Sequence, residues 1–156
     1  MYKILLALTI LISAVAAETL KVSTPVDSLH KYSYESQHGK IKMVPNYVKT
    51  IVISFEKDNS AMINEFLNKQ EPSYLESHNA IFIADINRMP SIITKMFALP
   101  KMKKYKHTIY LHNTDKFEKF VPSKDGKATI LKFKDKQVKS ISYISTIDEL
   151  KSVLEQ

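Results

Sequence analysis

The sequence predicts an α/β fold built on a central mixed sheet with helices on both faces. Residues 50–55 (TIVISF) are β-branched and aromatic without polar alternation, as in a strand that is buried on both faces. Residues 80–86 (AIFIADI) form a second such strand after a helical pattern, so the two strands make a right-handed, parallel βαβ unit. Residues 128–133 and 137–143 alternate between apolar and polar, which predicts a closing antiparallel hairpin with one face in water.

The first 17 residues have the pattern of a secretory signal peptide. Lys3 supplies one positive charge, residues 4–12 form an apolar run too short to span a bilayer, and small residues follow. We expect cleavage before Ala17 or Glu18, which places the mature chain in the periplasm. The alternative is an uncleaved N-terminal anchor. The segment offers no cysteine for lipid attachment.

Composition narrows the classes of function. Removing 17 of 156 residues leaves 139, the size of one domain with a single core. Without Lys3, 22 Lys and Arg (23 − 1) stand against 16 Asp and Glu, a net charge of +6. Such a protein can meet an anionic surface or an acidic protein partner, whereas nucleic acid is not expected for an exported chain. The chain has no cysteine, which excludes thiol exchange because that chemistry needs a thiolate.

The remaining β-structure and the N-terminal arm follow from local patterns. Residues 18–31 are expected to form an N-terminal arm with weak structure. Residues 32–43 alternate about Gly39, which predicts a β-hairpin ahead of the main fold. Residues 107–112 predict a third central strand, and residues 115–120 a short helix. The domain itself is expected to span residues 32–156.

Three longer helices are predicted from caps and apolar spacing. Asp58 or Asn59 is a good N-cap for the helix that follows the first central strand. Pro90 fits the first position of the next helix and Pro100 is expected to end it. Residues 146–149 (TIDE) form a capping box for the terminal helix. The apolar face of the helix after Pro90, which we expect to be buried, consists of Ile92, Ile93, Met96 and Phe97.

In this order the elements resemble the thioredoxin-like fold, and most closely its peroxiredoxin and exported thiol-reductase branch. Residues 37–40 (QHGK) are similar to a segment that precedes the first central strand in that branch. Residues 127–138 (KATILKFKDKQV) look like the family's closing sequence of cis-proline, threonine, strand, turn and strand. The resemblance covers residues 32–155 and implies a three-layer α/β fold with an N-terminal β-hairpin extension.

The chain departs from the family at both of its catalytic features. Ala128 stands where the family has its cis-proline. The resemblance therefore does not imply reductase, isomerase or peroxidase activity. It implies a vestigial active-site position, and the residues that stand where the family carries its cysteine motif are Lys57, Asp58, Asn59 and Ser60.

Ser60 raises one alternative, a thiol-independent hydrolase at this edge of the sheet. An oxygen nucleophile needs a base such as histidine within hydrogen-bond reach, and no histidine lies near Ser60 in the sequence. Asp58 or Ser60 is explained more simply as a helix cap. Catalytic residues are therefore not assigned.

The histidines predict no metal site. His107 and His112 lie five residues apart on one predicted strand, which places them on opposite faces of the sheet. His30, His38 and His78 are scattered without the spacing of metal ligands. We expect neither a metal nor a cofactor.

The densest group of positive charges is the best candidate for binding. A short lysine-rich loop is ordinary solvated surface in many proteins, but it can also bind an acidic protein, a phosphate or lipid headgroups. Its residues are Lys101, Lys103, Lys104, Tyr105, Lys106 and His107. The sequence thus predicts an exported binding or accessory module without redox catalysis, with a hydrolase or a peripheral membrane binder as alternatives.

Overall fold

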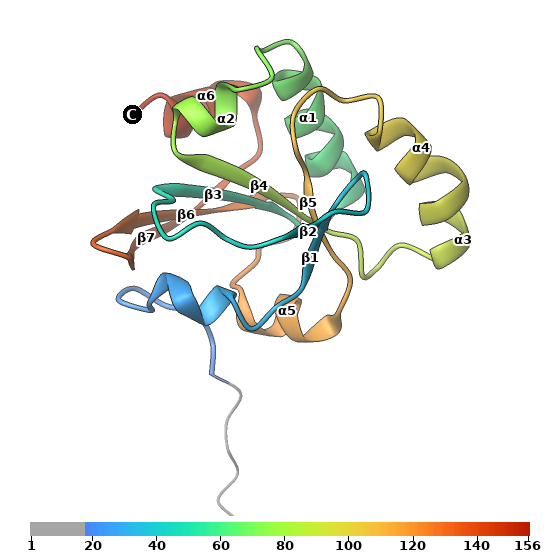
Figure 1. Ribbon diagram of the computed structural model, residues 1–156. Helices are drawn as coiled ribbons and strands as arrows, with labels where there is room; N and C mark the ends of the chain where they lie inside the picture. The colour runs from blue at the N-terminus through green and yellow to red at the C-terminus, as the bar shows by residue number, and fades with distance from the viewer. Residues whose placement is uncertain (1–17) are drawn as a thin grey trace, which may run out of the picture.

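The computed structural model describes residues 18–156, so the predicted signal peptide lies outside the described residues. This part of the chain forms one seven-stranded mixed sheet with helices on both faces, as the sequence predicts (Figure 1). The strands lie in the order β2-β1-β5-β4-β3-β6-β7. Their bounds are β1 Tyr34–Ser36, β2 Ile41–Lys42, β3 Thr50–Ser54, β4 Ala80–Asp85, β5 Tyr110–His112, β6 Ala128–Lys134 and β7 Gln137–Ile144.

The centre of the sheet is the predicted parallel pair, β3 and β4. Thr50 lies opposite Ala80, β5 continues the parallel arrangement beside β4, and β6 pairs antiparallel with β3. Every residue of β3 and β4 is buried, which explains why both strands lack polar alternation. The two predicted hairpins, β1–β2 and β6–β7, form the ends of the sheet. Strand β5 is shorter than predicted, because residues 107–109 precede it as irregular chain.

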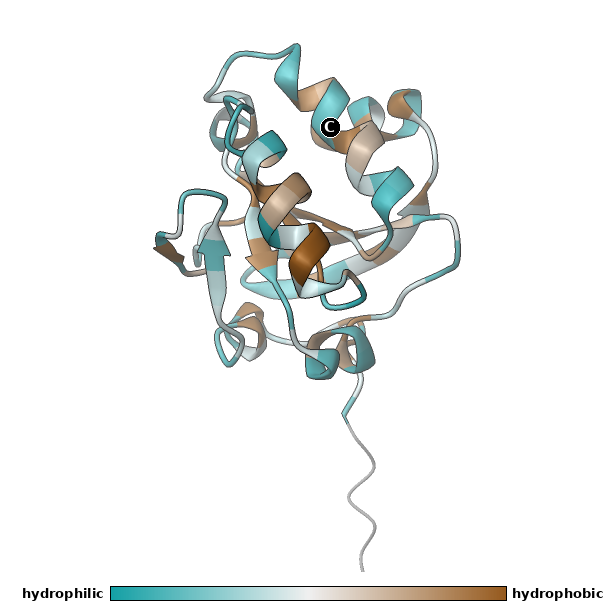
Figure 2. Cartoon of the chain, turned by 90° about the vertical axis from the view of Figure 1, so that its right-hand side faces the viewer, coloured by the Kyte–Doolittle hydropathy of each residue, from teal (hydrophilic) through white to brown (hydrophobic). Residues whose placement is uncertain are grey.

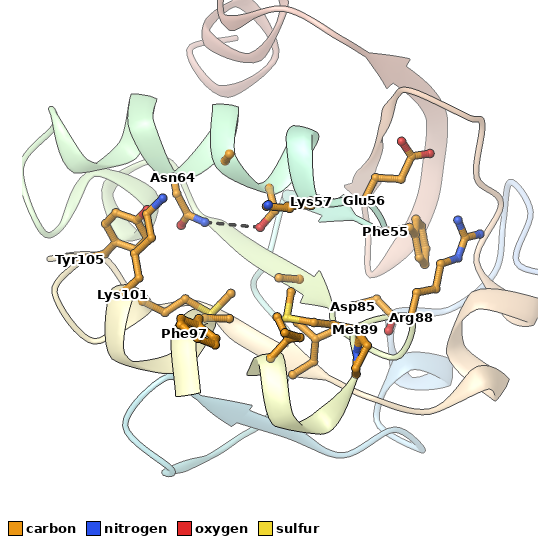
Figure 3. A pocket seen from close by; sticks show the side chains of 18 residues that line it. Phe55, Glu56, Lys57, Asn64, Asp85, Arg88, Met89, Phe97, Lys101 and Tyr105 are labelled. Carbon is orange, nitrogen blue, oxygen red and sulfur yellow. Dashed lines mark hydrogen bonds between the residues drawn. The ribbon is translucent and has the colours of Figure 1, made fainter. Parts of the chain in front are cut away.

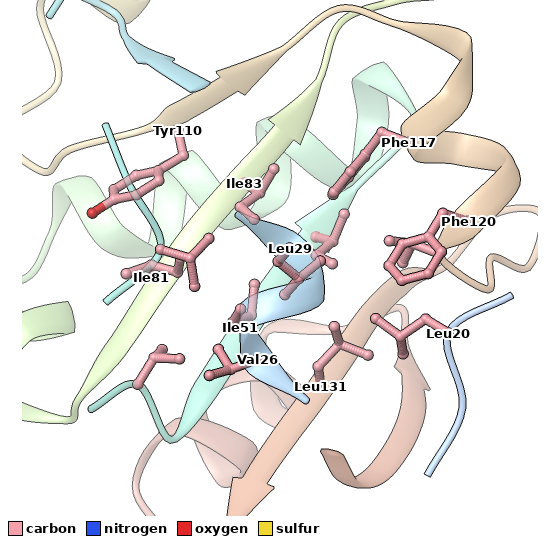
Figure 4. Close-up of a cluster of buried hydrophobic side chains, with 14 of the residues drawn as sticks. Leu20, Val26, Leu29, Ile51, Ile81, Ile83, Tyr110, Phe117, Phe120 and Leu131 are labelled. Carbon is pink, nitrogen blue, oxygen red and sulfur yellow. The ribbon is translucent and has the colours of Figure 1, made fainter. Parts of the chain in front are cut away.

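One face of the sheet is covered by α5 (Asp115–Phe120), the 3-10 helix η1 (Val26–Leu29) and the chain before it. The arm at residues 18–31, expected to be weakly structured, is instead part of this layer. Its side chains Leu20, Val26 and Leu29 are almost completely buried (Figure 4). Its backbone N–H groups at Leu20 and Val26 donate to carbonyl oxygens of residues 120 and 136. Polar residues separate these three apolar side chains in the sequence, so the local pattern did not predict that the arm packs against the sheet.

The other face carries α1 (Lys57–Asn68), α2 (Tyr74–Ser77) and α6 (Ile147–Leu154). Thr146 and Glu149 form the predicted capping box at the start of α6, which buries Leu150 and Leu154. The cap predicted for α1 is wrong. Glu56 is the N-cap and makes no side-chain cap bond, because its carboxylate accepts the backbone N–H of Gly126 at 3.0 Å.

The helix after Pro90 differs most from its prediction. It runs on through α3 (Ser91–Ile93), the π-helical turn η2 (Thr94–Ala98) and α4 (Leu99–Met102). Pro100 lies inside the helix rather than at its end, as the second residue of α4 after the π turn, where irregular hydrogen bonding tolerates a proline. The predicted apolar face is exposed: in these three segments Met102 is the buried residue. Within residues 18–156 no helix is long and apolar enough to cross a bilayer.

Candidate functional site

An open cavity of about 630 Å³ lies between α1 and the helix of residues 91–102. Its floor is the carboxyl end of β3 and β4, so it occupies the edge of the sheet at which α/β proteins commonly bind ligands (Figure 3). The volume falls within the range of small-molecule sites. Its walls are mainly apolar, formed by Phe55, Ala84, Ile86, Met89, Phe97 and Met102.

Two lysine side chains that form no ion pair within the described residues line the cavity. Lys57 on α1 and Lys101 on α4 line it from opposite sides, and both are exposed (Figure 3). Within residues 18–156 neither lysine forms an ion pair. Arg88 also lines the cavity, but Glu118 is bound to its guanidinium. The cavity therefore combines apolar walls with two lysines that are available to an anionic group.

Asp85 is a buried carboxyl in the cavity wall. Its side chain is 8% exposed, and Oδ1 accepts the backbone N–H of Asn87 at 2.8 Å. Oδ2 is buried and has no hydrogen-bond partner within the described part of the chain. Burial raises the pKa of Asp85 to about 6, although the Asn87 N–H acts in the opposite direction. Asp85 can therefore offer an acceptor, or below pH 6 a proton, to a ligand in the cavity.

A series of hydrogen bonds between polar side chains runs from His107, just before β5, through Asn64 on α1 to Ser60 at the cavity. His107 is 3% exposed, and its Nε2 lies 2.8 Å from Oδ1 of Asn64. An amide oxygen only accepts, so Nε2 carries the proton. Nδ2 of Asn64 then donates to Oγ of Ser60 at 3.4 Å. Burial lowers the pKa of His107 to about 4, which keeps the ring neutral at physiological pH.

Gln37 holds the chain segment that carries His107. Its Nε2 donates to the carbonyl oxygen of His107 at 2.7 Å, and its Oε1 accepts the N–H of Ile109 at 3.0 Å. Gln37 is 2% exposed, so it ties the β1–β2 hairpin to the approach to β5. Gln37, Asn64 and His107 are thus connected by hydrogen bonds although they are far apart in the sequence.

This arrangement gives Ser60 a hydrogen-bonding role and no partner that could activate it. Its side chain bonds to the amide of Asn64, and an amide does not accept a proton at neutral pH. The Nε2 of His107 is already occupied as a donor, and among residues 18–156 no base is bonded to Ser60. The geometry that a serine nucleophile requires is therefore not formed here.

The predicted vestigial position is only partly at the cavity. Lys57 and Ser60 line it, whereas Asp58 is exposed in the first turn of α1 and does not. Asn59 is buried under the helix, and its Nδ2 has no partner within the described residues. Ala128 is completely buried at the start of β6, inside the core below α1 and α6. Neither of these last two residues lines the cavity.

The predicted lysine-rich binding loop does not form one patch. Lys101 and Tyr105 line the apolar cavity, and Lys103 lines a second hollow of about 710 Å³ on the other side of the same helix. Lys104 and Lys106 are exposed. His107, the last residue of the predicted binding loop, is buried with its ring stacked on Tyr105 and is therefore not accessible for binding at the surface.

His107 and His112 lie on opposite faces of the sheet, although His107 precedes β5 and does not lie on the same strand as His112. His107 packs on the α1 side of the sheet, whereas His112 contacts Phe117 and Tyr34 on the α5 side. The Nδ1 and Nε2 of His112 are bonded to the carbonyl oxygen of Ser33 and to Oγ1 of Thr114. Within residues 18–156 no group of three or more His, Asp or Glu side chains is placed to hold a metal.

Sequence reasoning missed Asn64 and Asp85, the two polar residues that shape the cavity. Asp85 had a local signal, because it is a carboxyl at the carboxyl end of an apolar buried strand. Asn64 had none, since its partner His107 is 43 residues away. Phe97 was expected on a buried helix face, but its side chain is 64% exposed and lines the cavity.

Comparison with known proteins gives a fold and no closer relationship. No protein-family model matches the chain, and no curated protein does. Among solved structures, a cysteine-to-serine mutant of PrxQ from Xylella fastidiosa is similar with a TM-score of 0.59 and 11% identity, over 88% of this chain and 95% of that one. The chain has a thioredoxin-like fold.

Two further structures agree with this assignment. The bacterioferritin comigratory protein of Xanthomonas campestris gives a TM-score of 0.55 at 10% identity, over 90% of this chain and 96% of that one. A candidate protein disulfide isomerase from Bacteroides thetaiotaomicron gives 0.52 at 13% identity, over 89% and 87%. At such identities the likeness shows the thioredoxin-like fold alone. In this chain the fold is realised without cysteine.

Proposed function

We propose that the chain is an exported binding module that works without redox catalysis and takes an apolar ligand at the edge of its thioredoxin-like sheet. The observation that carries this proposal is the cavity of about 630 Å³ between α1 and residues 91–102. Apolar walls with a few polar groups are typical of small-molecule sites. Here the polar lining includes Ser60, Asn64, Asp85 and the lysines at positions 57 and 101, beside Glu56, Arg88 and Tyr105.

The absence of cysteine supports a role in binding rather than in thiol chemistry. The position that the resemblance assigns to the cysteine motif is occupied by the first turns of α1, which present Lys57 and Ser60 to the cavity. Neither side chain exchanges disulfides. The purified mature chain should therefore show no disulfide-reductase and no peroxidase turnover above a blank. Turnover with either substrate would contradict the proposal.

Export to the periplasm is the second part of the proposal. It is supported by the apolar run at residues 4–12 and the small residues that follow, all of which precede the described part of the chain. Intact-mass measurement of the protein isolated from its native host should give a chain that begins at Ala17 or Glu18. A mass that includes Met1 would favour the uncleaved anchor.

Binding in the cavity can be tested with 1-anilinonaphthalene-8-sulfonate, an aromatic sulfonate whose fluorescence rises in apolar surroundings. We expect a saturable increase with one site per chain. Ala61 is exposed on α1 and lines the cavity, so Ala61→Trp should fill its mouth and weaken binding by about tenfold.

The matched control is Glu65→Trp, one turn further along α1. Glu65 is also exposed but does not line the cavity, so this variant should bind the probe like the wild type. An absence of saturable binding, or equal loss in both variants, would rule out the cavity as the binding site.

A further inference from the structure

The helix of residues 91–102 carries large apolar side chains that nothing in the described chain covers. Ile92, Met96 and Phe97 are 62–64% exposed and Ile93 is 42% exposed. Figure 2, viewed from this side of the molecule, shows strongly hydrophobic positions on this outlying helix. A hollow lies on either side of it, so the helix stands out from the body and presents a convex apolar face. We call these four side chains the helix face.

Positive charge is concentrated around the helix face. Residues 86–114 contain no Asp or Glu, and they contain six of the cations that give the chain its net charge of +7. Among residues 18–156 only Arg88 of these six forms an ion pair. The five lysines that remain are exposed, at positions 95, 101, 103, 104 and 106.

We propose that the helix face docks on the surface of an anionic lipid bilayer. Helices that lie in the membrane interface combine protruding apolar side chains with flanking lysines. The apolar side chains enter the acyl boundary, and the lysines attract anionic headgroups. The five exposed lysines and the helix face, which are close together in the chain, supply these two components.

Two other occupants fit the helix face less well. A second copy of the chain would bring the five lysines of each partner toward one another, and like charges at an interface oppose association. An acidic protein would meet a surface whose free cations are all lysine, a residue that protein–protein interfaces avoid. A bilayer makes no directional demand on a lysine side chain, because headgroups rearrange around it.

This proposal does not depend on the ligand of the cavity. Ile93 and Phe97 of the helix face also line the cavity, but Ile92 and Met96, the residues changed in the test below, line neither hollow. The Ala61→Trp variant, which fills the cavity mouth, should therefore bind vesicles like the wild type.

The test is cosedimentation of the mature chain with vesicles of phosphatidylglycerol and phosphatidylcholine, compared with phosphatidylcholine alone. We expect binding to the anionic vesicles that weakens as salt rises from 20 to 500 mM, values chosen to shorten the screening length severalfold. Ile92→Asp with Met96→Asp should lower binding by at least about 100-fold. Lys103→Glu with Lys104→Glu should lower it by about 30-fold or more.

Two control variants change equally exposed residues elsewhere. Ile41→Asp with Met43→Asp alters two apolar side chains of the β1–β2 hairpin that are 84% and 69% exposed. Lys134→Glu with Lys139→Glu reverses two exposed charges on the β6–β7 hairpin. Both should bind with the affinity of the wild type after a small, salt-dependent correction for net charge.

No binding to anionic vesicles at low salt would overturn the proposal and favour an acidic protein partner. Equal losses in the control and helix-face variants would overturn it as well. All substituted side chains are exposed, so the variants should remain folded, and circular dichroism checks this for each one.

Discussion

Asp85 is buried at the end of β4, and only one of its two carboxyl oxygens accepts a hydrogen bond within the described residues. In the unfolded chain it ionises near pH 3.8, and in the folded chain only near pH 6. Between these two pH values the folded protein binds the Asp85 proton more tightly than the unfolded chain does. The free energy of unfolding therefore falls as pH rises from about 4 to about 6, and the loss is complete once Asp85 is ionised in the folded protein. Such an arrangement has a cost for stability, which is expected where a group serves a ligand rather than the fold.

Replacing Asp85 with asparagine should remove that cost. Near pH 4 the free energies of unfolding of Asp85→Asn and wild type should be similar. Above pH 6 the variant should be more stable by up to about 3 kcal/mol, since the pKa shift is about two units. Urea denaturation at pH 4, 5, 6 and 7 measures this difference. A difference that stays constant from pH 4 to pH 7 would contradict the assigned pKa.

Asn64 joins the core to the cavity through its bonds to His107 and Ser60. In Asn64→Ala the Nε2–H of His107 would be left buried without an acceptor, which should cost about 2 kcal/mol of stability. Ser60→Ala keeps the bond between His107 and Asn64 and removes only the long bond of 3.4 Å between Asn64 and Ser60, so it should cost less than about 1 kcal/mol of stability. Chemical denaturation of both variants gives the comparison. Equal costs would show that the bond between His107 and Asn64 contributes little.

At the scale of elements, the helix of residues 91–102 and α1 have the same length but differ in how many of their residues are buried. The three segments α3, η2 and α4 have 3, 5 and 4 residues, which together match the 12 residues of α1. Helix α1 buries five of its residues, whereas Met102 is the buried residue of the other helix. Segments with few buried contacts unfold locally at lower free energy.

Amide hydrogen exchange should therefore separate the two helices. The amides of residues 95–102 should exchange at least about tenfold faster than those of residues 61–68 in α1. Mass spectrometry of peptides from the two helices measures this. Similar protection in both would mean that the helix is held by more than its few buried contacts, and would weaken the case for an unpartnered helix face.

The elements also show what local patterns could and could not predict. The strands and the capping box of α6 were predictable, because an apolar run, a turn and a Thr–Glu pair are local features. The cap of α1 was not, because Glu56 bonds to Gly126, 70 residues away. The apolar spacing after Pro90 has the period of a helix, but a period does not say which neighbour covers the face.

At the scale of the whole molecule, element order was sufficient to predict the thioredoxin-like fold. It was not sufficient for the site, because His107, Asn64 and Gln37 meet only after folding. The lysine loop was recognised as a cluster in sequence, yet folding divides it between two hollows and the core. This cysteine-free chain has a cavity at the edge of its sheet, and the residues that line it carry the binding function that we propose.

The most direct measurement is a titration of the ¹⁵N-labelled mature chain with 1-anilinonaphthalene-8-sulfonate, followed by amide chemical shifts. We expect saturable shifts at Ser60, Asn64, Met89 and Phe97, which line the cavity, and none in the β6–β7 hairpin. Shifts that do not saturate, or that gather away from these residues, would contradict the claim that this thioredoxin-like protein is a binding module with its site at the sheet edge.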